Sequence, residues 1–305
     1  MISKLYNVAT MTRTLQLALL QHACPVDASK ADNLATCERL IRQAASDGAQ
    51  LIVTQELFAG HYFCQVEDDA QCDLAEPIPG PTSQHIASLA GELNVTISAS
   101  LFEKRTAGLY HNTTVTFGDR GDLIGKYRKM HIPDDPRFYE KYYFTPGDLG
   151  WQTFAMPAAK VGTLVCWDQW FPEAARLTAL KGAQLLLYPT AIGYYNDPSL
   201  GEPLQVREQQ RIAWQTMMQS HAIANGVFVA AANRIGTEDD LTFWGSSFIC
   251  GPDGKLIAQA SPDKEEVLHA ELDLSRIEPQ RRGWPFLRDR RIDAYDPLLK
   301  RLDDA

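Results

Sequence analysis

The stretch "VGTLVCWDQWFPEAARL", residues 161–177, places a cysteine where an apolar run meets a segment with helical spacing. Residues 161–165 predict a strand and residues 172–181 a helix, whose first turn suits Pro172 because an N–H there would have no helical partner. A thiol at such a bend projects from a sheet edge near backbone N–H donors, as in a nucleophile elbow. Most free cysteines are buried structural residues, so position alone makes Cys166 only a candidate nucleophile.

The sequence on either side of this stretch mixes strands and helices. Helices are predicted over residues 29–45, with Ser29 as a cap candidate, over 81–93 after Gly80-Pro81, and over 203–225. Predicted strands cover 15–20, 49–54, 95–101, 185–189, 227–232 and 266–272, and hairpins join 111–117 to 123–127 and 246–250 to 255–260. The chain is therefore expected to be an α/β protein with antiparallel sections.

Length and composition favour one folded domain. With 305 residues, 45% of them hydrophobic, the chain can bury one large core or two modest ones. No Gly/Ser linker, low-complexity block or repeat interrupts it. We expect a flexible leader over residues 1–12 and a single domain over 13–305, including a C-terminal extension from about residue 276.

Charge, hydropathy and cysteine content exclude several classes of partner. A formal net charge of −9 disfavours nucleic acid and favours a cationic small molecule. The apolar runs are shorter than the roughly 18–20 residues of a membrane span, so no membrane partner is expected. The six cysteines are scattered without CxxC or Cys/His pairing, which predicts neither a disulfide framework nor a zinc site. A reducing cytoplasm fits this pattern.

Two further reactive side chains follow predicted strands. Glu56 comes after "LIVTQ", where loss of water makes a carboxylate a usable base, and Lys129 ends "LIGKYRK". Ligand crevices in α/β sheets lie at strand ends, so an acid, an ammonium and a thiol could converge there. Each also has a simpler reading: Glu56 as a helix cap or ion-pair partner, and Lys129 as one of several solvated cations.

Three ordered motifs resemble the carbon–nitrogen hydrolase (nitrilase) superfamily. They are "TQELF" at 54–58, "YRKMHIPDDPRFYEKYYFTPGD" at 127–148 and "CWDQWFPEAAR" at 166–176. The last two are similar to its N-carbamoylputrescine amidohydrolases, and similarity continues to "RDRRIDAY" at 288–295. The resemblance implies a four-layer α-β-β-α sandwich, a homo-oligomer (dimer or larger), and neither a metal nor an organic cofactor.

The resemblance also implies roles for four residues. Glu56 matches the general base, Lys129 the catalytic lysine and Cys166 the nucleophile, while Glu140 matches a second glutamate beside them. A ureido or amide carbonyl is a poor electrophile, so a strong nucleophile, a cation near the developing oxyanion and a proton carrier for ammonia suit its hydrolysis. Glu140 is expected to orient Lys129 or the water; a purely structural role is the alternative.

The activity implied is cleavage of the terminal ureido group of N-carbamoylputrescine to putrescine, carbon dioxide and ammonia. Two alternatives remain open. One is an amidase of the same superfamily acting on another ω-amide or N-carbamoyl compound. The other is a binding protein that keeps the fold without turnover.

Aromatic and acidic residues near these motifs are candidates for substrate binding. Relatives acting on N-carbamoyl amino acids offer arginines near the position of Gln169 and Trp170, so an aromatic tunnel here favours an ammonium-bearing chain. After "TAIG" the expected glutamate is missing, so either Asp197 or Glu202 meets a distal amine or the substrate is a different one. The candidate lining residues are Tyr62, Phe63, Trp167, Asp168, Trp170, Tyr194, Tyr195 and Asp197; core packing is the alternative for the aromatics.

The C-terminal segment "RRGWPFLRDRR", residues 281–291, carries five arginines. We expect them to pair with acidic groups in a packed extension or a subunit contact, with anion binding as the weaker alternative.

Overall fold

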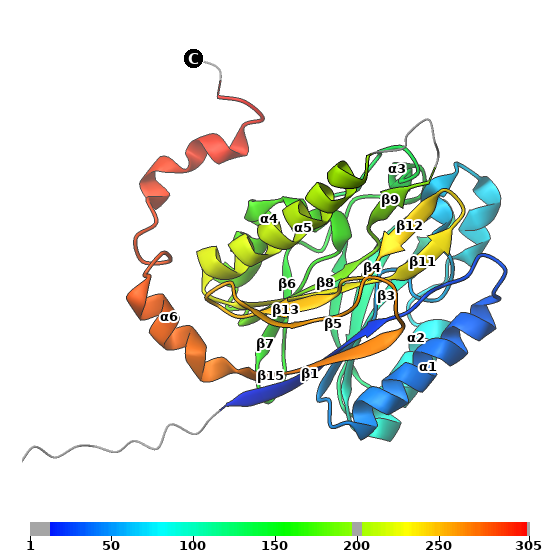
Figure 1. Cartoon of the computed structure of the whole chain (residues 1–305), viewed down its shortest axis with the longest axis horizontal. Coiled ribbons are helices and arrows are strands. Elements are labelled where there is room, and N and C mark those ends of the chain that lie inside the picture. The colour runs from blue at the N-terminus through cyan, green and yellow to red at the C-terminus, as the bar shows by residue number, and fades with distance from the viewer. Residues whose placement is uncertain (1–12, 197–202, 304–305) are drawn as a thin grey trace, which may run out of the picture.

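Two six-stranded sheets face each other in the computed structural model, which describes residues 13–196 and 203–303. Helices cover the outer face of each sheet, giving the predicted α-β-β-α sandwich (Figure 1). None of the helices among the described residues is long and apolar enough to cross a membrane. The expected leader, residues 1–12, lies outside the described residues.

The first sheet has the strand order β15-β1-β2-β3-β4-β5. Strands β1, β2 and β3 run parallel, whereas β15, β4 and β5 join by antiparallel pairing. Helices α1 and α2 pack on its outer face. The bounds are β1 Thr14–Gln21, α1 Lys30–Ser46, β2 Leu51–Val53, α2 Pro81–Leu93, β3 Thr96–Thr106, β4 Leu109–Phe117, β5 Leu123–Arg128 and β15 Glu266–Asp273.

The second sheet has the order β14-β13-β10-β8-β7-β6. Strands β7, β8 and β10 are parallel, and α4 and α5 cover their outer face. The bounds are β6 Gln152–Ala155, β7 Lys160–Thr163, α4 Pro172–Leu180, β8 Leu185–Thr190, α5 Leu204–Asn225, β10 Phe228–Asn233, β13 Phe248–Cys250 and β14 Leu256–Gln259.

The side chains of β1 alternate between the core that lies between the two sheets and the core beneath the outer helices. In β1, Leu15, Leu17 and Leu19 enter the core between the sheets, while Ala18 and Leu20 pack under α1 and α2. This is the period of two that a strand imposes on its side chains. Strands buried on both faces read as apolar runs, and this is why the sequence predicts them well.

The sequence missed several short strands. Strand β6 and a small third sheet, order β11-β12-β9, were not predicted. Their three or four residues each carry too little periodicity to distinguish a strand from a loop. Their bounds are β9 Gly193–Tyr195, β11 Ile235–Glu238 and β12 Leu241–Trp244; the short helices α3 Glu140–Tyr143 and α6 Ile277–Gly283 were also missed.

Beyond α6 lies the C-terminal arm, residues 284–303, which lies apart from the two sheets (Figure 1). Its arginines pair locally, Arg288 with Asp289 and Arg291 with Asp293. Large apolar side chains nevertheless face outward, and Leu299 is 92% exposed. The predicted acidic pairing is thus seen for two of the five arginines within the arm and for Arg282, which pairs with Glu278 in α6. Arg281 instead donates to the backbone carbonyls of residues 225 and 226.

Acid should destabilise this fold through Glu103, which is buried on β3. Burial favours its neutral form, but hydrogen bonds from Arg128, Lys126 and Thr113 outweigh burial and hold the pKa of Glu103 at about 2. The folded pKa of Glu103 lies below the unfolded value, so its contribution to the free energy of unfolding is fully present above about pH 4.5. This contribution, on the order of 3 kcal/mol, is lost as the pH falls toward 2.

Urea unfolding across this pH range measures the effect. Glu103→Gln should be less stable at pH 7 and should lose less stability between pH 4.5 and 2. Identical pH slopes for both proteins would contradict this assignment.

Candidate active site

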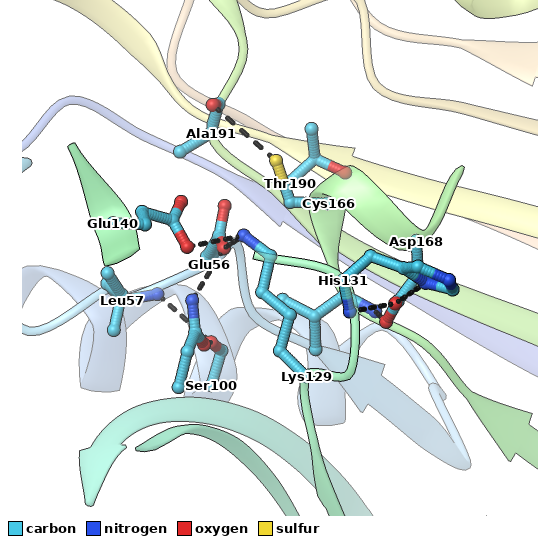
Figure 2. A network of polar contacts seen from close by, with 12 residues as sticks. Glu56, Leu57, Ser100, Lys129, His131, Glu140, Cys166, Asp168, Thr190 and Ala191 are labelled. Carbon is cyan, nitrogen blue, oxygen red and sulfur yellow. Dashed lines mark hydrogen bonds and ion pairs between the residues drawn. The ribbon is translucent and has the colours of Figure 1, made fainter. Parts of the chain in front are cut away.

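The candidate residues follow the carboxyl ends of strands in both sheets. Glu56 follows β2, and Lys129 directly follows β5. Since β5 pairs antiparallel with β4, and β4 with β3, β5 runs in the same direction as β3 and ends at the same edge as β2. Cys166 follows β7 of the second sheet. The sandwich therefore brings the three segments together, as Figure 2 shows.

Lys129 lies between two carboxylates, and all three side chains are fully buried. Its Nζ donates to Glu56 Oε1 at 2.8 Å and to Glu140 Oε2 at 2.7 Å. Asn112 Nδ2 also donates to Glu56 Oε1 at 2.7 Å, and the Tyr62 hydroxyl donates to Glu140 Oε1 at 2.7 Å. Three of the four carboxylate oxygens thus have protein donors.

The remaining oxygen, Glu56 Oε2, is buried and has no hydrogen-bond partner among the described residues. Figure 2 shows Cys166 on the side of Glu56 and Lys129 where this oxygen lies. The thiol is 5% exposed and donates only a long contact, 3.8 Å, to the carbonyl of Ala191. A free acceptor beside a weakly held thiol is the arrangement that proton abstraction needs.

Burial, followed by the charge of Glu56, raises the pKa of Cys166 well above its ordinary value, although Lys129 acts in the opposite direction. Burial also raises the pKa of Glu140. Burial opposes the charge of Lys129, but Glu140 and Glu56 outweigh it and raise the pKa of the ammonium. These directions favour a neutral thiol close to a cation, so a nucleophilic role of Cys166 would require a base.

Cys166 occupies a constrained bend. Its φ of 40° lies in the left-handed region, which a side chain with a Cβ adopts only when its surroundings enforce it. Asp168 stabilises this conformation. Its carboxylate accepts hydrogen bonds from Val165 N at 3.0 Å, Tyr127 OH at 2.8 Å and His131 N at 3.1 Å. Asp168 thus connects the bend at Cys166 to the segment that contains Lys129.

Asp168→Asn should loosen the bend. An amide nitrogen cannot accept, so two of the donors lose their partner at a cost of about 2–4 kcal/mol. We expect a lower urea midpoint together with a lower turnover rate in the folded protein. Asp119→Asn, in the exposed turn between β4 and β5, is the control. Unchanged stability of the Asp168 variant would contradict this role.

The predicted aromatic residues separate into two groups. Tyr62 packs on Phe138 with ring centroids 5.5 Å apart, and Phe138 packs on the half-buried Tyr195 at 6.2 Å. These rings form a row that begins at the Tyr62–Glu140 hydrogen bond. Phe63 belongs to the same buried cluster as Tyr62 and stacks on Phe102 at 4.9 Å.

The other predicted residues lie on the α5 side or in the bend. Tyr194 packs on Trp244, 4.7 Å between centroids. Trp167 and Trp170 are half-buried in the turn after Cys166. Gln169 is fully buried and accepts from Trp214 Nε1 at 2.7 Å, so its side chain braces α5. Asp197 and Glu202 lie outside the described residues.

Asn112 and Phe138 contact the candidate site residues but were not predicted from the sequence. Asn112 lies inside β4, where an alternating polar residue reads as an ordinary strand position. Phe138 belongs to a quoted motif, but no periodicity distinguishes it from a core residue. Within the described ranges, no group of three or more His, Cys, Asp or Glu residues could hold a metal ion.

A family model described as carbon-nitrogen hydrolase matches residues 16–282. The chain belongs to the carbon-nitrogen hydrolase family. Among curated relatives, N-carbamoylputrescine amidase of Solanum lycopersicum is 46% identical over 96% of this chain and 97% of that protein. Citrullinase of Francisella tularensis subsp. tularensis is 42% identical over 90% of this chain and 94% of that protein.

Solved structures agree with the fold of this carbon-nitrogen hydrolase. The crystal structure of a carbon-nitrogen hydrolase from Helicobacter pylori G27 has a TM-score of 0.90 and 46% identity, covering 94% of this chain and 99% of that one. The predicted superfamily and the predicted sandwich are therefore both confirmed.

Proposed function

We propose that this carbon-nitrogen hydrolase cleaves the terminal ureido C–N bond of N-carbamoylputrescine. The observation that carries the chemistry is the buried ammonium of Lys129 between Glu56 and Glu140, beside the thiol of Cys166. The 46% identity to the tomato N-carbamoylputrescine amidase over nearly the whole chain supports the substrate.

In the first half-reaction Glu56 takes the thiol proton through its free Oε2, and sulfur attacks the ureido carbonyl carbon. The carbonyl oxygen becomes negative and is stabilised by Lys129 and the backbone N–H of Trp167. Glu56 then returns the proton to the terminal nitrogen, which leaves as ammonia. A carbamoyl group carrying the diamine chain remains linked to Cys166.

In the second half-reaction Glu56 takes a proton from water, which attacks the linked carbonyl. The C–S bond breaks, the thiol regains its proton, and the product carbamate decomposes to putrescine and carbon dioxide. Glu140 accepts a second hydrogen bond from the Lys129 ammonium and holds it in place. These steps use protein groups and one water molecule.

The aromatic row Tyr62–Phe138–Tyr195 is our proposed wall for the four-carbon chain. Aromatic faces suit methylene groups and attract an ammonium end by cation–π interaction. Citrulline is the second candidate substrate, because the 42% identity to citrullinase extends over 90% of the chain. Both molecules carry the same terminal ureido group and differ at the far end.

Ammonia release from a matched panel tests the proposal. The panel contains N-carbamoylputrescine, citrulline, β-ureidopropionate and a dicarboxylate monoamide. We expect the highest kcat/KM for N-carbamoylputrescine. A higher kcat/KM for citrulline would identify citrulline as the substrate instead. Release of no ammonia from any of the four compounds would reject hydrolysis.

We further propose one domain over residues 13–305 that works as a homo-oligomer in the cytoplasm. All six cysteines are free, as a reducing compartment favours. The outward apolar side chains of the C-terminal arm, Leu298 at 64% and Leu299 at 92% exposed, fit a contact with a second copy.

Light scattering of the full chain and of a chain ending at Gly283 tests this assembly. We expect an oligomer for the full chain and a smaller species for the shortened chain. A full chain that is monomeric at micromolar concentration would reject the proposal.

A further inference from the structure

A second buried ion pair lies beside the site and takes no part in the proposed reaction. Arg234 follows β10 and Glu238 ends β11. Nη1 of Arg234 donates to both carboxylate oxygens of Glu238 at 2.9 Å, and the side chains are 0% and 1% exposed. The guanidinium therefore faces Glu238 with one nitrogen and leaves the other for different partners.

The second nitrogen holds the chain that follows β2. Nη2 of Arg234 donates to the carbonyls of Glu56 at 3.0 Å, Leu57 at 3.1 Å and Gly60 at 3.2 Å. Leu57 has a φ of 49°, so this turn adopts a conformation that a branched side chain does not favour by itself. A single cationic group thus fixes the backbone that carries Glu56.

Glu238 holds the other end of the same loop. Its carboxylate accepts the backbone N–H of Tyr62, and its carbonyl accepts from Gln65 Nε2 at 2.8 Å. The Tyr62 hydroxyl in turn donates to Glu140, the second partner of Lys129. Both carboxylates around Lys129 are therefore connected to one ion pair through the loop 56–62.

The energetics of the pair favour a role beyond stability. Burying two charges costs as much as their attraction returns, so apolar replacements are often equally stable. Arg234 Nε is moreover buried with no hydrogen-bond partner among the described residues, which adds a cost. The attraction between the two charges is therefore not the main contribution of the pair, which lies in its hydrogen bonds to the loop 56–62.

We propose that Arg234 and Glu238 are positioning residues that hold Glu56 and Tyr62 at the distance from Lys129 and Cys166 that proton transfer requires. This inference rests on the proposed function, because it presumes that Glu56 is the base. A displacement of about 1 Å in a reacting group can lower a rate by about 100-fold. The pair therefore acts on turnover more than on substrate binding.

The double variant Arg234→Met/Glu238→Gln separates positioning from folding. It leaves no buried charge unpaired, and the glutamine oxygen can still accept from Tyr62 N, while three loop carbonyls lose their donor. We expect kcat to fall about 10- to 100-fold with KM changed less than about 3-fold. Arg234→Lys is the second variant, because one ammonium keeps the charge but cannot span both sets of acceptors.

A readout independent of turnover is the rate at which iodoacetamide alkylates Cys166, followed on its own peptide across pH. Positioning predicts slower alkylation at neutral pH in both variants and a profile that approaches that of Glu56→Gln. Glu103→Gln removes a buried acid on β3 whose partners, Thr113, Lys126 and Arg128, are not part of the loop 56–62, and it should lower stability and leave the alkylation profile unchanged.

Two outcomes overturn the inference, and they differ from failure of the proposed function. A folded double variant or folded Arg234→Lys with wild-type kcat and alkylation profile would show that the pair does not position Glu56. Activity losses that merely match the unfolded fraction would show the same. If instead Glu56→Gln itself remains active, the proposed function fails first.

Discussion

Cys166→Ala is expected to lower kcat/KM by at least about 10⁴-fold, because covalent catalysis loses its only nucleophile. The fold should persist. Alanine is smaller than cysteine, has the same Cβ at φ 40°, and gives up only the 3.8 Å contact to Ala191. Ammonia release from N-carbamoylputrescine and a thermal melt measure the two effects.

Cys250→Ala is the matched control for this variant. Cys250 is also buried, belongs to β13 in the sheet that contains β7, and lies outside the proposed site. The control should lose some stability through lost packing and keep its activity. An alanine variant of Cys166 that retains more than about a hundredth of wild-type kcat/KM would contradict the assigned nucleophile.

Lys129→Met should both inactivate and destabilise the protein. Methionine fills similar space without the charge, so the oxyanion loses its cation at a cost of about 10²- to 10³-fold in kcat. Glu56 and Glu140 then face each other across a buried space with no cation between them. Removing one partner of a buried ion pair typically costs about 3–5 kcal/mol.

The pH dependence of this variant provides a specific test. Burial already raises the pKa of Glu140, and loss of Lys129 removes a charge that lowers it. A carboxyl with a raised folded pKa stabilises the fold fully below its unfolded pKa and loses that contribution as pH rises. Lys129→Met should therefore regain stability in acid, as urea unfolding at pH 5 and pH 8 would show.

The double variant Lys129→Met/Glu140→Gln is the control. Neutralising Glu140 removes one of the two buried charges, so stability at pH 8 should recover while activity stays low. Recovery of activity in the double variant would contradict the role of Lys129 at the oxyanion.

The sequence predicted the main frame of the sandwich because its strands are apolar on both faces. Strand β1 and helix α2 were located to within a residue or two, since alternation in the first and Gly80-Pro81 at the second are strong local patterns. Strand β9 could not be located, since three residues give no period.

Local patterns marked candidate site residues only where chemistry follows a strand end, whereas Glu140 was predicted from the family resemblance. Glu56, Lys129 and Cys166 each stand just beyond a strand, but their convergence depends on how the two sheets face each other, which no local pattern encodes. Arg234 shows the limit clearly. Its partners, the carbonyls of residues 56, 57 and 60, lie far away in the chain, so nothing near Arg234 marks its role.

During turnover the substrate is expected to become linked to the sulfur of Cys166. Acid quenching of the enzyme with excess N-carbamoylputrescine, followed by peptide mass mapping, measures this directly. We predict a mass gain equal to the substrate less one ammonia on the peptide that contains Cys166. Continued ammonia release with no such gain, or with the gain on another of the six cysteines, would contradict it.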